Sequence, residues 1–150
     1  MTETILFLCT GNYYRSRFAE ALFNWEARRR RARDVRAISR GLATFLVKDF
    51  PETLSPDTEA ELRARGISPE EFAGDGPRQL ENGDLATAAR IIALNEREHR
   101  AMLDATHPGW AERVEFWNIL DVEADAPAAQ LPRLAEAVLA LLDETVSVRP

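Results

Sequence analysis

Residues 5–9, ILFLC, form an apolar run in which no polar residue alternates with the apolar ones. Such a run indicates a strand that is buried on both faces, as strands are in a parallel sheet with helices on either side. We expect this strand to span residues 4–9. The rest of the fold must then supply further parallel strands and the helices that cover them.

The remaining sequence alternates helical and strand patterns. Helices are expected over residues 16–31, 56–67, 84–89, 96–106 and 131–146, the first and last from apolar residues at helical spacing. Asp57 is expected to cap the second of them. Strands are expected over residues 35–39, 90–94 and 113–119, with turn-rich segments over 41–56 and 68–83. Together these patterns predict a single α/β domain, residues 1–150, with a four-stranded parallel sheet flanked by helices on both faces.

Charge and composition exclude several classes of protein. The net charge of −6 argues against general nucleic-acid binding, although residues 28–33 contain five arginines. We interpret that basic run as the solvated end of a helix, with a docking patch for an acidic partner as the alternative. No apolar run approaches the roughly 18 residues of a membrane span. The N-terminal residues lack a basic segment and a long apolar run, so we do not expect a secretory signal there. The single cysteine cannot form an internal disulfide, so we expect a protein of the reducing cytoplasm. From the charge and the apolar runs, we expect neither a membrane nor a nucleic acid as partner.

The segment CTGNYYRS, residues 9–16, joins the first strand to the first helix. A loop at that point directs backbone N–H groups and the helix dipole toward one spot, which suits a dianion. Gly11 permits positive φ and a close approach of the backbone, and Asn12 can hydrogen-bond the loop to itself. Arg15 adds a planar fork that can hold two phosphate oxygens. The segment therefore predicts a phosphate-binding loop after the first strand.

Cys9 lies at the start of this loop, where the same positive field favours the thiolate form of a cysteine. Ser16 can donate a hydrogen bond to the sulfur. A thiolate beneath a phosphate-shaped cradle is an arrangement for nucleophilic attack on phosphorus. The alternative is that Cys9 is a small buried hydrophobe, as free cysteines often are. The nucleotide-binding pattern G-x-x-x-x-G-K-[ST] is absent, and no cluster of ligand residues indicates a metal.

The motif C-x-G-N-x-x-R-S-x-x-A-E resembles that of the low-molecular-weight protein tyrosine phosphatases, which share their fold with the thioredoxin-coupled arsenate reductases. The matching residues are Cys9, Gly11, Asn12, Arg15, Ser16, Ala19 and Glu20. The resemblance continues in SRG (39–41), in PDTEAELRARGI (56–67) and in residues 77–99, so it covers nearly the whole chain.

This resemblance implies a phosphomonoester hydrolase, specifically a protein tyrosine phosphatase, that works through a phosphocysteine on Cys9. Arg15 and the amides of residues 10–15 would hold the phosphate, Ser16 would stabilise the thiolate, and Asn12 would brace the loop. The phosphate site would comprise Thr10, Gly11, Asn12, Tyr13, Tyr14, Arg15 and Ser16. The partner would be a phosphorylated protein or a small phosphomonoester, with inorganic phosphate or another oxyanion also bound by the loop. The mechanism needs no cofactor and no metal.

The family also uses an aspartate as general acid in a loop after its fourth strand, and two residues here compete for that role. Asp121 lies four residues after Trp117 and matches the family's spacing better, although Val122 follows it where the family usually has proline. Asp125, within the sequence DAP, is the alternative. A further alternative, less favoured than an acid role for Asp121, is that both are solvated loop carboxylates.

The residues that would select the substrate are less defined by the sequence. Four aromatic side chains could either form a slot around the tyrosine ring or pack within the fold: Tyr13, Tyr14, Phe45 and Trp117. For Trp117 we favour packing. We expect His99 on a helix surface and His107 in a loop, with no catalytic role for either.

Two other functions stay open. Arsenate reduction passes oxidation to further thiols as disulfides, and this chain has no second cysteine, since Tyr14 occupies the position where many family phosphatases have one. Only a route through an external thiol such as glutathione remains. A non-catalytic module that holds phosphate or a phosphoprotein is the second alternative, because the general acid is not fixed.

Overall fold

The central element of the fold is a four-stranded parallel sheet. A computed structural model describes residues 2–121 and 126–147 of the chain. The strands are β1 (Glu3–Cys9), β2 (Val35–Gly41), β3 (Arg90–Ala93) and β4 (Val114–Phe116), in the spatial order β2-β1-β3-β4. All three strand pairs are parallel, as the sequence predicts.

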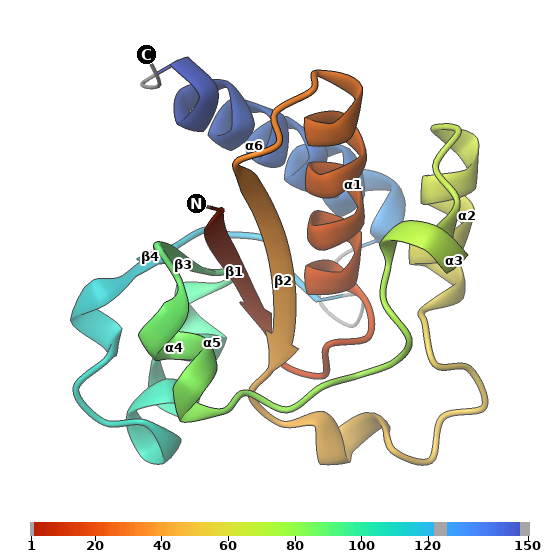
Figure 1. Ribbon diagram of the computed structural model, residues 1–150. Helices are drawn as coiled ribbons and strands as arrows, with labels where there is room; N and C mark the ends of the chain where they lie inside the picture. The colour runs from red at the N-terminus through yellow and green to blue at the C-terminus, as the bar shows by residue number, and fades with distance from the viewer. Residues whose placement is uncertain (1, 122–125, 148–150) are drawn as a thin grey trace.

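Helices cover both faces of this sheet (Figure 1). One face is covered by α1 (Arg15–Arg29) and α6 (Pro127–Ser147), with α2 (Pro56–Ala64) and α3 (Pro69–Phe72) beside them. The other face carries α4 (Asn82–Thr87) and α5 (Glu96–Thr106). The short helices η1 (Thr44–Val47) and η2 (Ala111–Arg113) lie in the connections. The expected α/β architecture is therefore confirmed.

The central strand β1 explains why two apolar cores form. Ile5 and Phe7 pack into the cluster beneath α1 and α6, whereas Leu6 and Leu8 pack into the cluster beneath α4 and α5. All four side chains are fully buried. Because successive side chains of a strand point to opposite faces, the uninterrupted apolar run is what a strand between two helical layers requires.

Several element boundaries differ from the sequence predictions for local reasons. The cap of α2 is Ser55, whose Oγ accepts a hydrogen bond from the Thr58 amide at 3.5 Å, and not Asp57. Pro56 then occupies the first helical position, where its missing N–H costs nothing. Helix α3 lies in a segment predicted as turns, and α6 begins four residues earlier than predicted, at Pro127.

Strand β4 is shorter than the predicted 113–119, but the chain beyond it stays attached to β3. The amide of Trp117 donates to the Ala93 carbonyl at 2.9 Å, and the amide of Ile119 donates to the Leu94 carbonyl at 2.7 Å. These bonds carry the chain to Asp121 along the carboxyl edge of the sheet. None of the helices within the described ranges is long and apolar enough to cross a membrane.

The basic run at residues 28–33 lies at the end of α1, where cations complement the helix dipole. Its side chains form ion pairs with nearby acids. Arg28 pairs with Glu71, and Arg29 and Arg30 both pair with Glu26. These pairs agree with the interpretation of the run as a solvated helix end.

Candidate active site

Cys9 is the last residue of β1, and the loop that follows it leads directly into α1 (Figure 1). The thiol is almost completely buried, with 2% of the residue exposed. The loop turns tightly at Asn12, whose φ of 53° lies in the left-handed region that asparagine tolerates better than most residues. This turn brings the backbone back over the sulfur.

Two donors point at the Cys9 sulfur. The amide of Asn12 donates to Sγ at 3.3 Å, and Ser16 Oγ lies 2.8 Å from Sγ. Since Ser16 Oγ itself accepts a hydrogen bond from Asn12 Nδ2 at 2.8 Å, its own hydrogen is directed to the sulfur. The sulfur thus accepts hydrogen bonds from the loop and from the first turn of α1.

Asn12 ties the loop to two other segments of the chain. Its Nδ2 also donates to Ser39 Oγ at 2.9 Å, and its Oδ1 accepts the Arg78 amide at 2.8 Å. Ser39 in turn donates to Glu20 at 2.6 Å. The residue is 1% exposed, so these bonds are shielded from water and hold the loop in one shape.

The end of β2 presses against this loop, and glycine is required there. A Cβ on Gly41 would lie 2.9 Å from the carbonyl oxygen of Thr10 and 3.0 Å from the Asn12 side chain. The first distance is shorter than real Cβ contacts and the second is tighter than nine in ten of them, so a larger residue would displace the loop. Gly41 is therefore a structural part of the site. In the sequence, the SRG segment (39–41), which resembles the family, is the feature that indicates this role.

Arg15 lies in the first turn of α1 with 1% of its surface exposed. Its two terminal nitrogens donate to the two oxygens of Glu98, Nη1 at 3.0 Å and Nη2 at 3.1 Å. Nη1 also donates to the Ile119 carbonyl at 2.9 Å, and Asp121 Oδ2 lies 3.5 Å from Nη2. Burial lowers the pKa of the guanidinium, but the Glu98 hydrogen bonds and the negative charges of Cys9 and Asp121 outweigh it, so the net shift is upward.

Glu98 is a site residue that the sequence reasoning missed. It lies in the first turn of α5, directly after β3, and residues 5–8 of β1 pair with β3. Because parallel strands end at the same edge of the sheet, the start of α5 necessarily lies near the loop after Cys9. A charged residue shortly after the predicted third strand was the feature of the sequence that could have indicated this role.

His99 is buried beneath the loop, so the prediction of a surface position is wrong. Its Nδ1 accepts the Asn95 amide at 3.1 Å, and its Nε2 lies 3.1 Å from Thr10 Oγ1. These partners assign the ring hydrogen to Nε2, which donates to Thr10. Burial, together with the nearby charge of Arg15, lowers the pKa of His99 to about 3, so the ring is neutral. It supports Thr10, whose hydroxyl can donate to Glu98 at 3.4 Å.

A cleft of about 760 Å³ opens above the loop. Its walls are partly apolar, with Leu46, Val47, Phe50 and Met102 beside Tyr13 and Tyr14. Its other lining residues include three carboxylates, Asp57, Glu98 and Asp121. The cleft thus brings together the predicted residues Cys9, Thr10, Gly11, Arg15 and Asp121.

Two of the four aromatic candidates lie away from this cleft. Trp117 packs against Phe7 in the core, with ring centroids 5.9 Å apart, as the packing interpretation predicted. Phe45 is 67% exposed and does not line the cleft. Phe50, which the sequence reasoning missed, instead meets the Tyr13 ring edge-on at 5.0 Å. Asp125, the alternative acid, lies outside the described residues.

A cysteine at the end of a strand, a short loop after it, and an arginine in the first turn of the next helix line one cleft, as expected for a cysteine-dependent phosphatase. Within residues 2–121 and 126–147, no group of three or more His, Cys, Asp or Glu side chains could hold a metal. The family model of the low molecular weight phosphotyrosine protein phosphatases matches residues 4–127, and the chain belongs to that family. The resemblance seen in the loop motif is thereby confirmed.

Individual relatives agree with this assignment. The chain is 28% identical over 130 residues to the low molecular weight protein-tyrosine-phosphatase YfkJ of Bacillus subtilis, covering 86% of this chain and 78% of YfkJ. It superimposes on the YwlE arginine phosphatase of Geobacillus stearothermophilus with a TM-score of 0.76 and 20% identity, covering 97% and 94% of the two chains. It also superimposes on Vibrio vulnificus Wzb in complex with benzylphosphonate, with a TM-score of 0.75, 17% identity and coverage of 96% and 99%.

Proposed function

We propose that the protein hydrolyses phosphotyrosine in proteins, or a small phosphomonoester, with Cys9 as nucleophile. The observation that carries this proposal is the pair of donors on the Cys9 sulfur, from the Asn12 amide at 3.3 Å and from Ser16 at 2.8 Å. A purely structural cysteine has no need of two such donors at the base of an open cleft. The alternative that Cys9 is only a small buried hydrophobe leaves them unexplained.

The reaction follows from the position of each group. The Cys9 thiolate attacks phosphorus while the bond to the tyrosine oxygen breaks, and Asp121 gives its proton to the departing oxygen. Water then attacks the phosphocysteine, with Asp121 taking up the proton, and releases phosphate and the thiolate. The loop amides of residues 10–15 and the Arg15 guanidinium hold the equatorial oxygens throughout. The mechanism uses no cofactor.

Asp121 is the proposed acid because it shares the cleft with Cys9 and lies 3.5 Å from Arg15. Asp125 remains the alternative. The acid must reach the leaving oxygen on the far side of the phosphoryl group from the sulfur, and Asp121 lines the same cleft as Cys9. Tyr13 and Phe50 supply the apolar surface against which a phenol ring can pack.

Phosphoarginine is a second candidate substrate, and the carboxylates of the cleft favour it. Asp57, Glu98 and Asp121 line the cleft, where Arg15 is the one cationic side chain among the lining residues. A leaving group with a guanidinium would meet opposite charge there, and bidentate carboxylate–guanidinium pairs are strong. A phosphotyrosine ring has no use for that charge, so the two substrates can be told apart by kcat/KM on matched phosphopeptides.

The proposal is tested by turnover of p-nitrophenyl phosphate. We expect hydrolysis by the wild type, background rates for Cys9→Ser, and a phosphoryl adduct on the Cys9 peptide after rapid acid quench. Arg15→Lys should stay inactive, because a point charge cannot replace a two-pronged fork. Turnover of Cys9→Ser at the wild-type rate would refute the nucleophile.

The same assays address the remaining alternatives. A wild type that binds phosphate without any turnover would indicate a binding module. Arsenate reduction that depends on glutathione would indicate the reductase route, since Cys9 is the only thiol in the chain. The lone reduced cysteine also supports the cytoplasm as the proposed location.

A further inference from the structure

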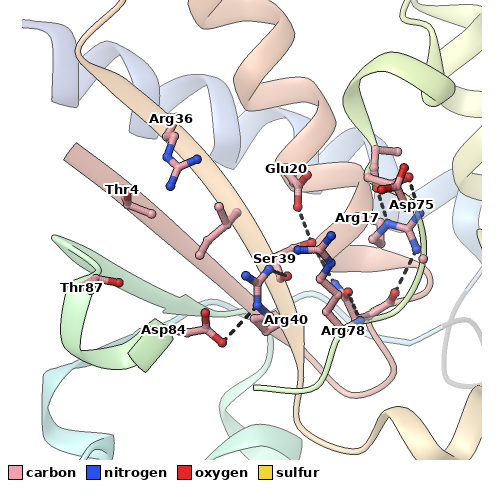
Figure 2. A pocket seen from close by; sticks show the side chains of 15 residues that line it. Thr4, Arg17, Glu20, Arg36, Ser39, Arg40, Asp75, Arg78, Asp84 and Thr87 are labelled. Atoms are coloured by element: carbon pink, nitrogen blue, oxygen red, sulfur yellow. Dashed lines mark hydrogen bonds and ion pairs between the residues drawn. The ribbon is translucent and has the colours of Figure 1, made fainter. Parts of the chain in front are cut away.

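A second cleft, of about 380 Å³, lies along β2 at the edge of the sheet (Figure 2). It shares no lining residue with the active-site cleft, but Asn12 of the Cys9 loop (residues 9–16) is part of its wall. Arg17, from the first turn of α1, lines it together with the segment 73–76. The cleft along β2 therefore borders the Cys9 loop from outside the active site.

Arg17 is buried, with 2% of the residue exposed, and its guanidinium donates to backbone carbonyls (Figure 2). Nη1 donates to the Asn12 carbonyl at 3.2 Å and to the Thr53 carbonyl at 2.8 Å. Nη2 donates to the Gly74 carbonyl at 3.2 Å, and Nε donates to the Ala73 carbonyl. A guanidinium has five N–H donors, and these bonds use four of them. Arg17 thus joins three separate segments of the chain.

The position of Arg17 is unfavourable for a cation. Burial lowers the pKa of its guanidinium, and the first turn of a helix is where the dipole favours anions. The negative charges of Glu20, Cys9 and Asp75 oppose the shift, whereas the positive charge of Arg78 adds to it. None of these groups forms an ion pair with Arg17 within residues 2–121 and 126–147. Its donors are directed at carbonyls instead, which indicates that the side chain serves to hold the backbone.

The bond to the Asn12 carbonyl fixes the direction of one peptide group of the Cys9 loop. In a trans peptide the carbonyl and the next N–H point in opposite directions, and the described residues contain no cis peptide bond. Because the Asn12 carbonyl points toward Arg17, the amide of Tyr13 points to the other side. That side faces the active-site cleft, which Tyr13 lines and Asn12 does not.

The next two carbonyls of the loop are held by other groups. The Tyr13 carbonyl accepts the Ser55 amide at 2.9 Å, and the Tyr14 carbonyl accepts the Thr58 hydroxyl at 2.9 Å. These two bonds direct the amides of residues 14 and 15 in the same way, and neither involves Arg17. A change at Arg17 should therefore act first on the amide of Tyr13.

We propose that Arg17 is a positioning residue for catalysis, which aims the Tyr13 amide at the phosphoryl group by holding the Asn12 carbonyl. The inference rests on the proposed function, in which the loop amides bind the equatorial oxygens. A preorganised N–H donor of this kind contributes about 10²–10³ to kcat. Without Arg17 the peptide is free to rotate, because the φ of 53° at Asn12 lies in a sparsely populated region that the surrounding bonds must maintain.

Nuclear magnetic resonance of protein carrying ¹⁵N-labelled tyrosine tests the proposal. The chain has two tyrosines, Tyr13 and Tyr14, so the spectrum contains two backbone amide signals and both come from the loop. Tyr13→Phe assigns them by removing one. At saturating inorganic phosphate, both signals of the wild type should shift. In Arg17→Gln the shift of the Tyr13 amide should be largely lost, whereas the Tyr14 amide should keep its shift.

Turnover of p-nitrophenyl phosphate gives a second measurement. The kcat of Arg17→Gln should fall about 10²-fold per folded molecule, as after removal of one oxyanion donor. Arg17→Lys keeps the buried charge but replaces the fork by one nitrogen, so it should show the same selective loss at smaller size. It carries the comparison if Arg17→Gln does not fold.

Asn24→Ala is the matched control for stability. Asn24 also ties α1 to the backbone of another segment, through bonds of 2.9 and 2.8 Å to the carbonyl and amide of Ala37, and these bonds do not involve the Cys9 loop. This variant should be less stable than the wild type, but it should keep kcat and both phosphate-induced shifts.

The possible results separate this proposal from the proposed function. A Tyr13 amide that does not respond to phosphate in the wild type, or that responds equally in Arg17→Gln and Arg17→Lys, would overturn the positioning role even if the enzyme turns over. Equal loss of both tyrosine shifts would overturn it as well, because Arg17 would then only support the fold. The expected shifts without any turnover by the wild type would refute the hydrolase and leave the positioning of a bound anion intact.

Discussion

Glu98 grips Arg15 with both of its carboxylate oxygens, at 3.0 and 3.1 Å from the two terminal nitrogens of the guanidinium. Arg15 is the proposed holder of the substrate phosphate, so a carboxylate of the protein itself occupies the fork in the resting site. An incoming dianion must either displace Glu98 or bind beside its negative charge. The contact therefore positions Arg15 and at the same time competes with the substrate.

Replacing Glu98 with glutamine separates these two effects. Glu98→Gln removes the charge and keeps the size, and Glu98 is 29% exposed, so the fold should tolerate it. We expect the inhibition constant of inorganic phosphate to fall by roughly tenfold, because a like charge next to the anion is lost. The measurement is competitive inhibition of p-nitrophenyl phosphate turnover at low ionic strength. Unchanged or weaker phosphate binding would show that Glu98 only positions Arg15.

Asp121 and Asp125 are distinguished by the leaving group. Asp121→Ala should lower kcat about 10²–10⁴-fold for esters of poorly acidic phenols, since they depart only with a proton. Esters of acidic phenols, such as p-nitrophenol, should be affected much less. The measurement is kcat across a series of aryl phosphates, with Asp125→Ala as the matched variant. If Asp125→Ala gives the steep dependence and Asp121→Ala does not, the assignment of the acid is wrong.

Substitution of His99 should change how the stability of the protein depends on pH, and it should not change the pH profile of kcat. Its pKa is about 3 in the folded protein against 6.5 ordinarily, so the unfolded chain binds the extra proton between these values. Stability from this group is full above pH 6.5 and is lost as the pH falls toward 3. The free energy of unfolding should change by at most about 1.4 kcal/mol per pH unit because of this group. Urea unfolding between pH 4 and 7.5 should show a shallower acid-side loss for His99→Gln, with the pH profile of kcat unchanged in shape.

The parts of the site that follow from local pattern could be predicted, and those that depend on tertiary contacts could not. Cys9, Arg15 and the loop lie within one stretch of eight residues, and the apolar run before it fixes the end of the strand. The position of His99 was predicted wrongly because a polar residue was assigned to the helix surface. The spacing of four to Leu103, which is also buried, places both on the inner face of α5.

Glu98 and the cleft along β2 show a different limit. Arg15 and Glu98 are 83 residues apart, and only the parallel pairing of β1 with β3 brings them together. Likewise, Arg36 and Arg78 line one cleft because the segment after α3 returns to the end of β2, where the Gly41 amide donates to the Arg78 carbonyl at 2.8 Å. Neither relationship has a signature in sequence spacing. The first follows from the order in which the strands pair, and the second from the path of the segment after α3.

Glu20 provides a test of the buried network behind the loop. Burial raises its pKa above the ordinary 4.5, although the hydrogen bond from Ser39 opposes the shift. The folded protein therefore binds this proton more tightly than the unfolded chain does. Stability from this group is greatest below pH 4.5 and falls as the pH rises through the raised value. Glu20→Gln keeps an oxygen that can accept from Ser39 and removes the titration, so it should be more stable than the wild type at pH 8.

Unfolding by urea at pH 4.5 and at pH 8 measures the difference. The gain of Glu20→Gln over the wild type should shrink toward zero as the pH is lowered, which separates it from a general packing effect that would persist at both values. Glu136→Gln, at an exposed position of α6, is the control and should show no such dependence. A Glu20→Gln variant that is less stable than the wild type at pH 8 would mean that the carboxylate is held in its charged form by Arg17 and Arg40. The link from Ser39 through Asn12 to Ser16 would then end at a charged carboxylate.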